Sequence, residues 1–201
     1  KTGPLRMGAI LQAFRLPAYR GAALGYFGHM WELYAFWMLV PWLVATALGP
    51  DATPRAISAL SFLVIGVGTL GAIWAGWMSR QWGSARLAWA SLCASGTVCL
   101  LYPWVQSVGT SVALSALVIW GFFVVADSAQ FSALSAKACA PEDVGSALAI
   151  QNSLGFAISV GSILWISALV EDGSVEIVWW LLIGPLFGLI AMRRDLWRLA
   201  P

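Results

Sequence analysis

Six stretches of this chain are long and apolar enough to cross a lipid bilayer, and this feature limits the possible folds most. We expect spans at about 21–48, 56–78, 87–105, 110–136, 144–170 and 175–192. A spanning helix needs about 20 mostly apolar residues. Backbone polar groups inside a bilayer must be paired within the protein, and these runs lack the alternation of a membrane barrel. The sequence therefore predicts an all-α, polytopic membrane bundle of six transmembrane helices.

The composition agrees with a membrane protein and argues against several other classes. The chain is 60% hydrophobic and 10% charged, whereas soluble domains have about 25% charged residues. A net charge of +2 without a basic run gives no reason to expect nucleic acid as a partner. The three cysteines lie in or beside apolar segments and indicate small buried side chains rather than disulfides or metal ligands. We expect no metal and no cofactor.

The distribution of lysine and arginine predicts the orientation in the membrane. Short polar segments that contain turn-forming residues separate the six apolar runs. Ten basic residues then fall on one side of the membrane, and only Arg55 falls on the other. Because cytoplasmic loops are enriched in basic residues, both termini are expected in the cytoplasm. We expect a cytoplasmic segment 1–20, a transmembrane domain 21–192 and a cytoplasmic tail 193–201, in the inner (plasma) membrane.

The first span combines a stripe of small residues with two ionisable side chains. One face of the helix is formed by residues at a spacing of four and three: Gly21, Gly25, Gly28, Glu32 and Ala35. Small residues let membrane helices approach closely, so Glu32 is expected on a packing face. At a rise of 1.5 Å per residue it lies about 16 Å deep, near the middle of the bilayer. His29, the only histidine, is three residues away and within reach of Glu32.

The fourth span repeats this arrangement with Asp127 and Gln130. If the helix emerges near Ala136, Asp127 lies about 14 Å from the cytoplasmic face, close to the depth of Glu32. Ionisable groups at such depth usually face a cavity or a partner. They indicate either a proton and substrate pathway, or a structural cluster in which His29 caps Glu32 and Asp127 bonds another helix. Because burial disfavours the charged form of a carboxyl group, we expect Glu32, assisted by Asp127, to bind a proton.

The fifth span has a face of small and amide residues. Gln151, Gly155, Ser159 and Ser162 share this face, and Asn152 lies beside it. Residues of this kind commonly join membrane helices, which is the interpretation that we favour. Lining of a substrate cavity is the alternative.

One loop has the spacing of a known transporter signature. The segment GWMSRQWGSAR, residues 76–86, resembles the loop G-x-x-x-D-R-x-G-R-[KR] of the major facilitator superfamily. Gly76 and Gly83 match its two glycines, and Arg86 adds a positive charge after them. Arg80 stands where the signature has its acidic residue, and two small residues replace basic ones. Such departures are typical of the copy in the second half of these transporters, where the loop controls conformational change.

Three further segments, 25–37, 126–134 and 141–156, resemble the seventh, tenth and eleventh helices of bacterial members of this superfamily. The resemblance implies the C-terminal half of a fold with two six-helix halves, between which a small solute binds. It also implies that Glu32 and Asp127 lie on helices lining the central cavity. Half a transporter has no opposite wall, so we expect either a missing N-terminal half or a second copy as partner. The face formed by spans one, two, four and five is expected to be polar.

Two other classes of function compete with proton-coupled transport. A zinc hydrolase needs about three protein ligands, and one histidine without an HExxH arrangement does not supply them. The sequence also has no G-x-S-x-G elbow, so we do not expect an enzyme. A non-transporting membrane subunit or scaffold with a half-transporter fold remains the alternative.

Overall fold

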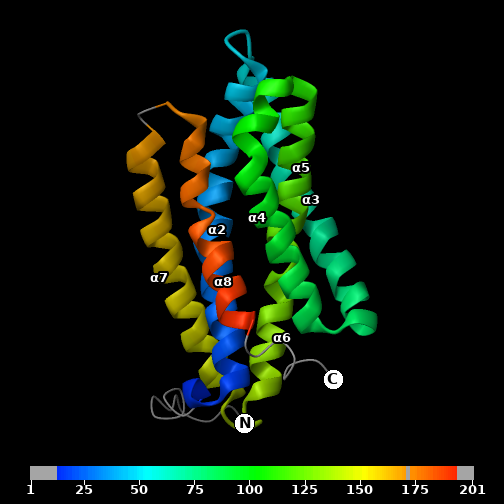
Figure 1. Ribbon diagram of the computed structural model, residues 1–201, viewed down its shortest axis with the longest axis vertical. Helices are drawn as coiled ribbons and strands as arrows, with labels where there is room; N and C mark the ends of the chain where they lie inside the picture. Colours follow the sequence, from blue (N-terminus) through cyan, green and yellow to red (C-terminus); the bar gives the residue numbers. More distant parts are fainter. Residues whose placement is uncertain (1–12, 171–172, 194–201) are drawn as a thin grey trace.

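The computed structural model describes residues 13–170 and 173–193 and contains six antiparallel spans (Figure 1). The first three and the fifth are single helices: α2 (Pro17–Leu48), α3 (Pro54–Trp82), α4 (Ser84–Val108) and α7 (Val144–Val170). The fourth is made of α5 (Thr110–Ala126) and α6 (Ser128–Ala138), and the sixth of a 3-10 helix, η1 (Val175–Trp180), and α8 (Ile183–Arg193). All six are long and apolar enough to cross a membrane. The predicted all-α bundle of six transmembrane helices is confirmed.

The expected terminal segments lie largely outside the described residues. Of segment 1–20, the structure describes residues 13–20, and of the tail 193–201 it describes Arg193 alone. The first span begins at Pro17, four residues before the predicted start, because proline is well tolerated in the first turn of a helix.

The fourth and sixth spans are interrupted, whereas the sequence predicted continuous helices. In the fourth, Asp127 forms a turn whose carbonyl accepts from both Gln130 N (3.0 Å) and Phe131 N (3.1 Å). In the sixth, Pro185 lies in the first turn of α8. Proline has no N–H to donate to the preceding turn, so the backbone hydrogen bonds are interrupted between η1 and α8. A count of apolar residues does not detect such breaks.

Helix α2 is the central element of the bundle. It packs against α3, α5, α6, α7 and α8 and lies behind α8 in the view of Figure 1. Its predicted stripe of small residues is buried along its whole length, Glu32 included. This confirms that Glu32 lies on a packing face.

Glycines allow two pairs of helices to touch backbone to backbone. A Cβ on Gly28 of α2 would lie 2.3 Å from the carbonyl oxygen of Gly184 in α8. Between α3 and α5, a Cβ on Gly71 would lie 2.1 Å from the carbonyl oxygen of Phe122, and one on Gly121 equally close to that of Val64. Since membrane helices associate largely through close packing, these contacts fix the positions of α8 and α3.

The apolar core is unevenly distributed along the bundle. Its larger cluster fills the half that contains the end of α2 at Leu48, with Leu33, Phe36, Leu39, Leu43, Leu117, Trp120 and Val124 among its members. A smaller cluster occupies the half in which α2 begins, and includes Tyr26, Met30 and Phe131. The level of Glu32 and Asp127 lies between the two.

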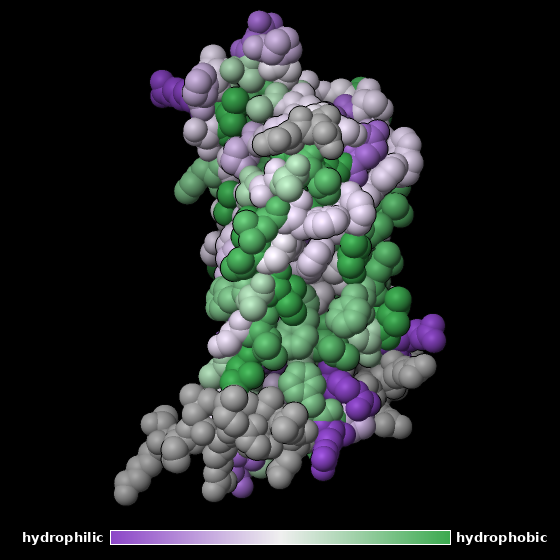
Figure 2. Space-filling model, turned by 90° about the vertical axis from the view of Figure 1, so that its left-hand side faces the viewer, coloured by the Kyte–Doolittle hydropathy of each residue, from purple (hydrophilic) through white to green (hydrophobic). Residues whose placement is uncertain are grey.

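The outer surface matches a bilayer. Figure 2 shows a broad apolar belt with hydrophilic residues gathered toward the ends of the bundle. Large apolar side chains are exposed on the outward faces of three helices, such as Ile73 on α3, Leu164 on α7 and Ile190 on α8. Apart from Glu32 and Asp127, the charged residues within the described ranges lie at or near helix ends. The chain is a multi-pass membrane protein.

Across the part of the spans that the structure describes, the expected polar face is not present. At mid-span, the exposed large side chains of α3, α5 and α7 are apolar, for example Leu70, Ile119 and Val160. The ionisable residues of the spans are instead enclosed within the bundle, with Glu32 and Asp127 each 1% exposed. A charge facing lipid is costly, so the six helices cover these groups themselves.

Candidate functional site

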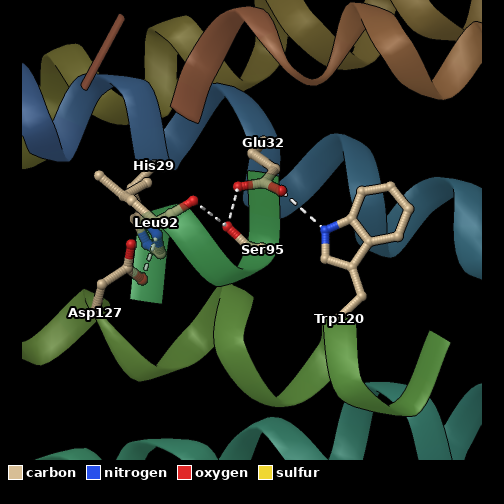
Figure 3. A network of polar contacts seen from close by, with 6 residues as sticks. All are labelled: His29, Glu32, Leu92, Ser95, Trp120 and Asp127. Carbon is tan, nitrogen blue, oxygen red and sulfur yellow. Dashed lines mark hydrogen bonds and ion pairs between the residues drawn. The ribbon is translucent and has the colours of Figure 1, made fainter. Parts of the chain in front are cut away.

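Five side chains from three spans form a buried acid–histidine cluster (Figure 3). His29 and Glu32 come from α2, Ser95 from α4, Trp120 from α5, and Asp127 from the turn between α5 and α6. All five are almost completely buried, at 0 or 1% exposure. The break at Asp127 therefore lies beside the central helix, at the level of His29.

Glu32 is held by two neutral donors. Ser95 Oγ donates to Oε2 at 3.0 Å, and Trp120 Nε1 donates to Oε1 at 2.8 Å. The Ser95 hydroxyl also lies 3.3 Å from the carbonyl oxygen of Leu92. Among the described residues no cation lies within ion-pair distance of the Glu32 carboxylate. The protein thus fixes both carboxyl oxygens without supplying a compensating charge.

Asp127 contacts His29 instead. The distance from His29 Nδ1 to Asp127 Oδ1 is 2.9 Å, within the range of an ion pair, although the ring N–H is not aligned as in a regular hydrogen bond. The rings of Tyr26 and Phe131 lie beside the imidazole, with centroids 6.0 and 5.9 Å from it. When the imidazole and the carboxyl group share one titratable proton, the pair is uncharged with the proton on Asp127 and zwitterionic with the proton on His29.

The interpretation that His29 caps Glu32 is wrong. The two residues are three apart on α2, which separates them by about 60° around the helix axis. His29 therefore faces the α5–α6 turn, whereas Glu32 faces α4 and the middle of α5. Ser95 and Trp120 were not predicted from the sequence as members of the site. One signal was available for Trp120, because tryptophan normally lies near the membrane surface and this one lies in the middle of a span.

The other predicted polar residues lie outside these hydrogen bonds. Gln130 on α6 is 3% exposed, and Gln151 on α7 is fully buried with neither amide atom paired within the described part of the chain. Asn152 is half-buried. Ser159 donates to the carbonyl oxygen of Met30 at 2.9 Å, and a Cβ on Gly155 would lie 2.5 Å from the ring of Tyr26. This face of α7 therefore joins α7 to α2, as favoured from the sequence.

The loop that resembles the transporter signature connects α3 to α4. Gly83 has a φ of 79°, which glycine adopts without strain, and its N–H donates to Ser79 O at 2.9 Å. Arg80 and Arg86 are exposed on either side of this turn, and Gly76 is exposed on α3. The loop forms a tight turn with two exposed positive charges at the end of the bundle where α2 begins.

Chemically, the cluster is suited to exchange protons. It contains two carboxyl groups and one imidazole on two adjacent spans, and each of these groups can gain or lose a proton. Within ranges 13–170 and 173–193, no three histidine, cysteine, aspartate or glutamate residues are placed to hold a metal ion.

Comparison with known proteins adds no assignment. No model of a known protein family matches the chain, and no curated protein is significantly similar to it in sequence. The geometry of the acid–histidine cluster is therefore the main indication of function.

Proposed function

We propose that the chain is the C-terminal six-helix half of a proton-coupled secondary transporter of the major facilitator type. It would move a small solute by alternating access across the inner membrane, with both termini in the cytoplasm. The observation on which this proposal depends is the acid–histidine cluster, enclosed at mid-depth between the first and fourth spans.

Energetics support a protonation role for the cluster. A charged carboxylate enclosed in a membrane protein is costly unless it is paired. Among the described residues Glu32 has two neutral donors, Ser95 and Trp120, and no cation as partner, so a bound proton is the simplest way to remove its charge. Loss of that proton would place a negative charge where α2, α4 and α5 meet. The packing of these helices would then favour a different arrangement, which is the coupling that a proton-driven transporter needs.

The superfamily resemblance supports the same role for these helices. The first and fourth helices of each half line the central cavity in such transporters, and here they bear Glu32 and Asp127. Basic residues also gather at one end of the bundle, with Arg15, Arg20, Arg80, Arg86, Lys137 and Arg193 there and Arg55 at the other. Such asymmetry is typical of a cytoplasmic end. An N-terminal half, or a second copy, would dock on α2, α3, α5 and α7 through apolar side chains such as Leu70, Ile119 and Val160.

Proton flux in proteoliposomes tests the proposal. The complete transporter is reconstituted with a pH-sensitive dye inside the vesicles. Gradients of amino acids, sugars, organic cations and organic anions are then imposed one class at a time. A gradient of at least one class should drive proton movement that protein-free vesicles do not show. If no class moves protons or labelled solute, proton-coupled transport is contradicted.

A non-transporting subunit or scaffold is the second candidate, and one observation favours it. The polar groups of Glu32, Ser95 and Trp120 are bonded to one another across three helices and almost fully buried, as in a cluster that only holds helices together. In that case Glu32→Gln would weaken the fold or its assembly with a partner, and the wild-type protein would move no solute.

A further inference from the structure

We infer that protons reach the His29–Asp127 pair along a hydrated path from the end of the bundle where α2 begins. Ser91 of α4, Ser135 of α6 and Gln151 of α7 line this path. The inference extends the proposed function, because it assigns the side from which the protonation site is loaded.

Unpaired polar atoms are the first line of evidence. His29 Nε2, Ser91 Oγ, Ser135 Oγ and both amide atoms of Gln151 have no hydrogen-bond partner among the described residues. Their side chains are 0 or 1% exposed. Buried polar groups are nearly always bonded to protein or to ordered water, and a buried water typically bonds about three such groups. Unpaired groups from four helices in one region therefore indicate hydration.

The two serines lie at different levels along the bundle. Ser91 lies one turn before Ser95 on the same face of α4. One turn further, Leu87 packs with Ala126, the residue that precedes Asp127. Ser135 lies one turn beyond Phe131 on α6, and both are buried. Ser135 thus lies between Asp127 and the end where α6 terminates, whereas Ser91, one turn further from that end than Leu87, lies near the level of Asp127 on α4, which packs against α6.

Contacts of α7 with α2 place Gln151 toward the same end of the bundle as Ser135. One turn before it, the carbonyl oxygen of Ala147 accepts a hydrogen bond from Tyr19 Oη at 3.1 Å. One turn after it, Gly155 contacts the ring of Tyr26. Gln151 therefore faces α2 between the levels of Tyr19 and Tyr26.

Two aromatic rings separate these groups from the histidine. Tyr26 and Phe131 pack edge to face with centroids 6.5 Å apart, and both rings adjoin His29. A rotamer change of either ring would connect the unpaired imidazole nitrogen to the polar groups below it. A proton could then pass through hydrogen-bonded water to His29 or to a carboxylate oxygen of Asp127, while the aqueous phase loses that proton.

In the opposite direction, apolar side chains fill most of the interior. Between the cluster and the end of α2 at Leu48 lies the larger apolar core, in which Phe36, Leu117 and Val124 are at most 1% exposed. The Tyr102 hydroxyl and Gln106 Oε1, one turn apart on α4, are also unpaired there among the described residues, but the Tyr102 ring stands within that core and packs against Trp120 with centroids 5.9 Å apart.

The other titratable groups that face the cluster do not provide a competing charge in the path. Besides Glu32, they are Tyr26 on α2 and, on the side of the larger core, Cys99 and Tyr102 on α4. On α6 and α7 the buried polar residues in this region are Gln130, Ser135, Gln151 and Ser159. Lys137 of α6 is exposed at the end of the bundle.

Thiol labelling tests the path without requiring transport. In the full-length protein, the three native cysteines are replaced and a single cysteine is introduced at Ser135 or Gln151. A small charged methanethiosulfonate is then added to oriented vesicles from either side. We expect Ser135→Cys and Gln151→Cys to react from the side that carries Arg20 and not from the other. The matched control Leu117→Cys, in the larger core, should react from neither side.

Reaction from the opposite side, from neither side, or equally at Leu117→Cys would overturn the path. If a cysteine variant fails to fold, the rate of proton uptake by the purified protein after a fall in pH decides instead. Gln151→Leu should slow this uptake, whereas Tyr102→Phe should not, and equal rates would contradict the inference. If Ser135→Cys is labelled as expected but no solute drives protons, the path exists and the proposed transport function is wrong.

Discussion

At the scale of single residues, the support of Glu32 by neutral donors is the feature with most consequences. Ser95 and Trp120 approach one carboxyl oxygen each, and both are buried with it. When one donor is removed, the loss in folding free energy exceeds the net contribution of the hydrogen bond, because the buried acceptor is left unsatisfied. Ser95 offers the cleaner test, since Trp120 also packs against Phe36 with ring centroids 4.6 Å apart.

Ser95→Ala should destabilise the protein by about 1 kcal/mol, the usual size of such a loss in membrane and soluble proteins. The matched control is Ser91→Ala, one turn away on the same face, whose hydroxyl has no partner among the described residues. This control should cost less, because the Ser91 hydroxyl is expected to bond water and not a protein group. Unfolding by sodium dodecyl sulfate from mixed micelles measures both variants. An equal loss for the two serines would show that the bond to Glu32 contributes no stability.

Pairing of residues was the least predictable part of the site. The depth and burial of Glu32 and Asp127 followed from the spacing of small residues and the length of the spans. The partners did not, because a sequence gives neither the rotation of each helix nor its neighbours. His29 and Glu32 point in different directions from α2, so that His29 contacts Asp127 and Glu32 accepts from Ser95. Spacing within one helix gives the angle between the two side chains but not the residues of other helices that they meet.

At the scale of elements, glycine contacts determine how closely the spans pack. Gly71 of α3 lies against the backbone of Phe122 in α5, so a side chain at position 71 has no room unless the helices separate. A Cβ added to Gly66 of the same helix would meet no atom of another described element within 4 Å. The close packing of α3 against α5 therefore requires a glycine at position 71 but not at position 66.

Gly71→Ala should lower stability by about 1–3 kcal/mol, the usual cost of overpacking. Gly66→Ala should leave stability unchanged or raise it by up to about 1 kcal/mol, because alanine favours a helix over glycine. Detergent unfolding of the two variants in parallel distinguishes these outcomes. A loss at position 66 as large as at position 71 would contradict the close contact between α3 and α5.

The number and order of helices were predictable because apolar length decides them. The interruptions at Asp127 and between η1 and α8 were not. A run of apolar residues looks the same whether or not its backbone hydrogen bonds are continuous, and Asp127 within the fourth span indicated a polar site but not a turn. Pro185 was a visible signal for the second break, since proline cannot continue the hydrogen-bond pattern of a helix.

At the scale of the whole molecule, the six spans and the uneven distribution of basic residues define an orientation. Loop residue Ala52, between α2 and α3, and Ser84, at the start of α4, lie at opposite ends of the bundle. An even number of spans places both termini at the same end of the bundle. This end also bears Arg80 and Arg86, and we propose that it faces the cytoplasm.

Cysteine labelling in whole cells checks this orientation. Ala52→Cys should react with a membrane-impermeant thiol reagent added outside, and Ser84→Cys should react only after the cells are opened. The positive charge near Ser84 would otherwise have to cross the membrane, which basic loops resist. Equal labelling of both positions in intact cells would contradict the six-span topology.

The most direct test of a protonation role for Glu32 is its exchange for glutamine in the complete transporter. Glu32→Gln keeps the size of the side chain, and its amide oxygen can accept from Trp120 while its NH2 group donates to the Ser95 hydroxyl, but it cannot bind and release a proton. Accumulation of solute driven by a proton gradient should be lost, whereas exchange of solute at equal concentrations should persist. Glu176→Gln, an exposed residue of η1, is the matched control and should retain both activities. If Glu32→Gln still accumulates solute at the expense of the proton gradient, Glu32 is a structural residue and the proposed protonation role is wrong.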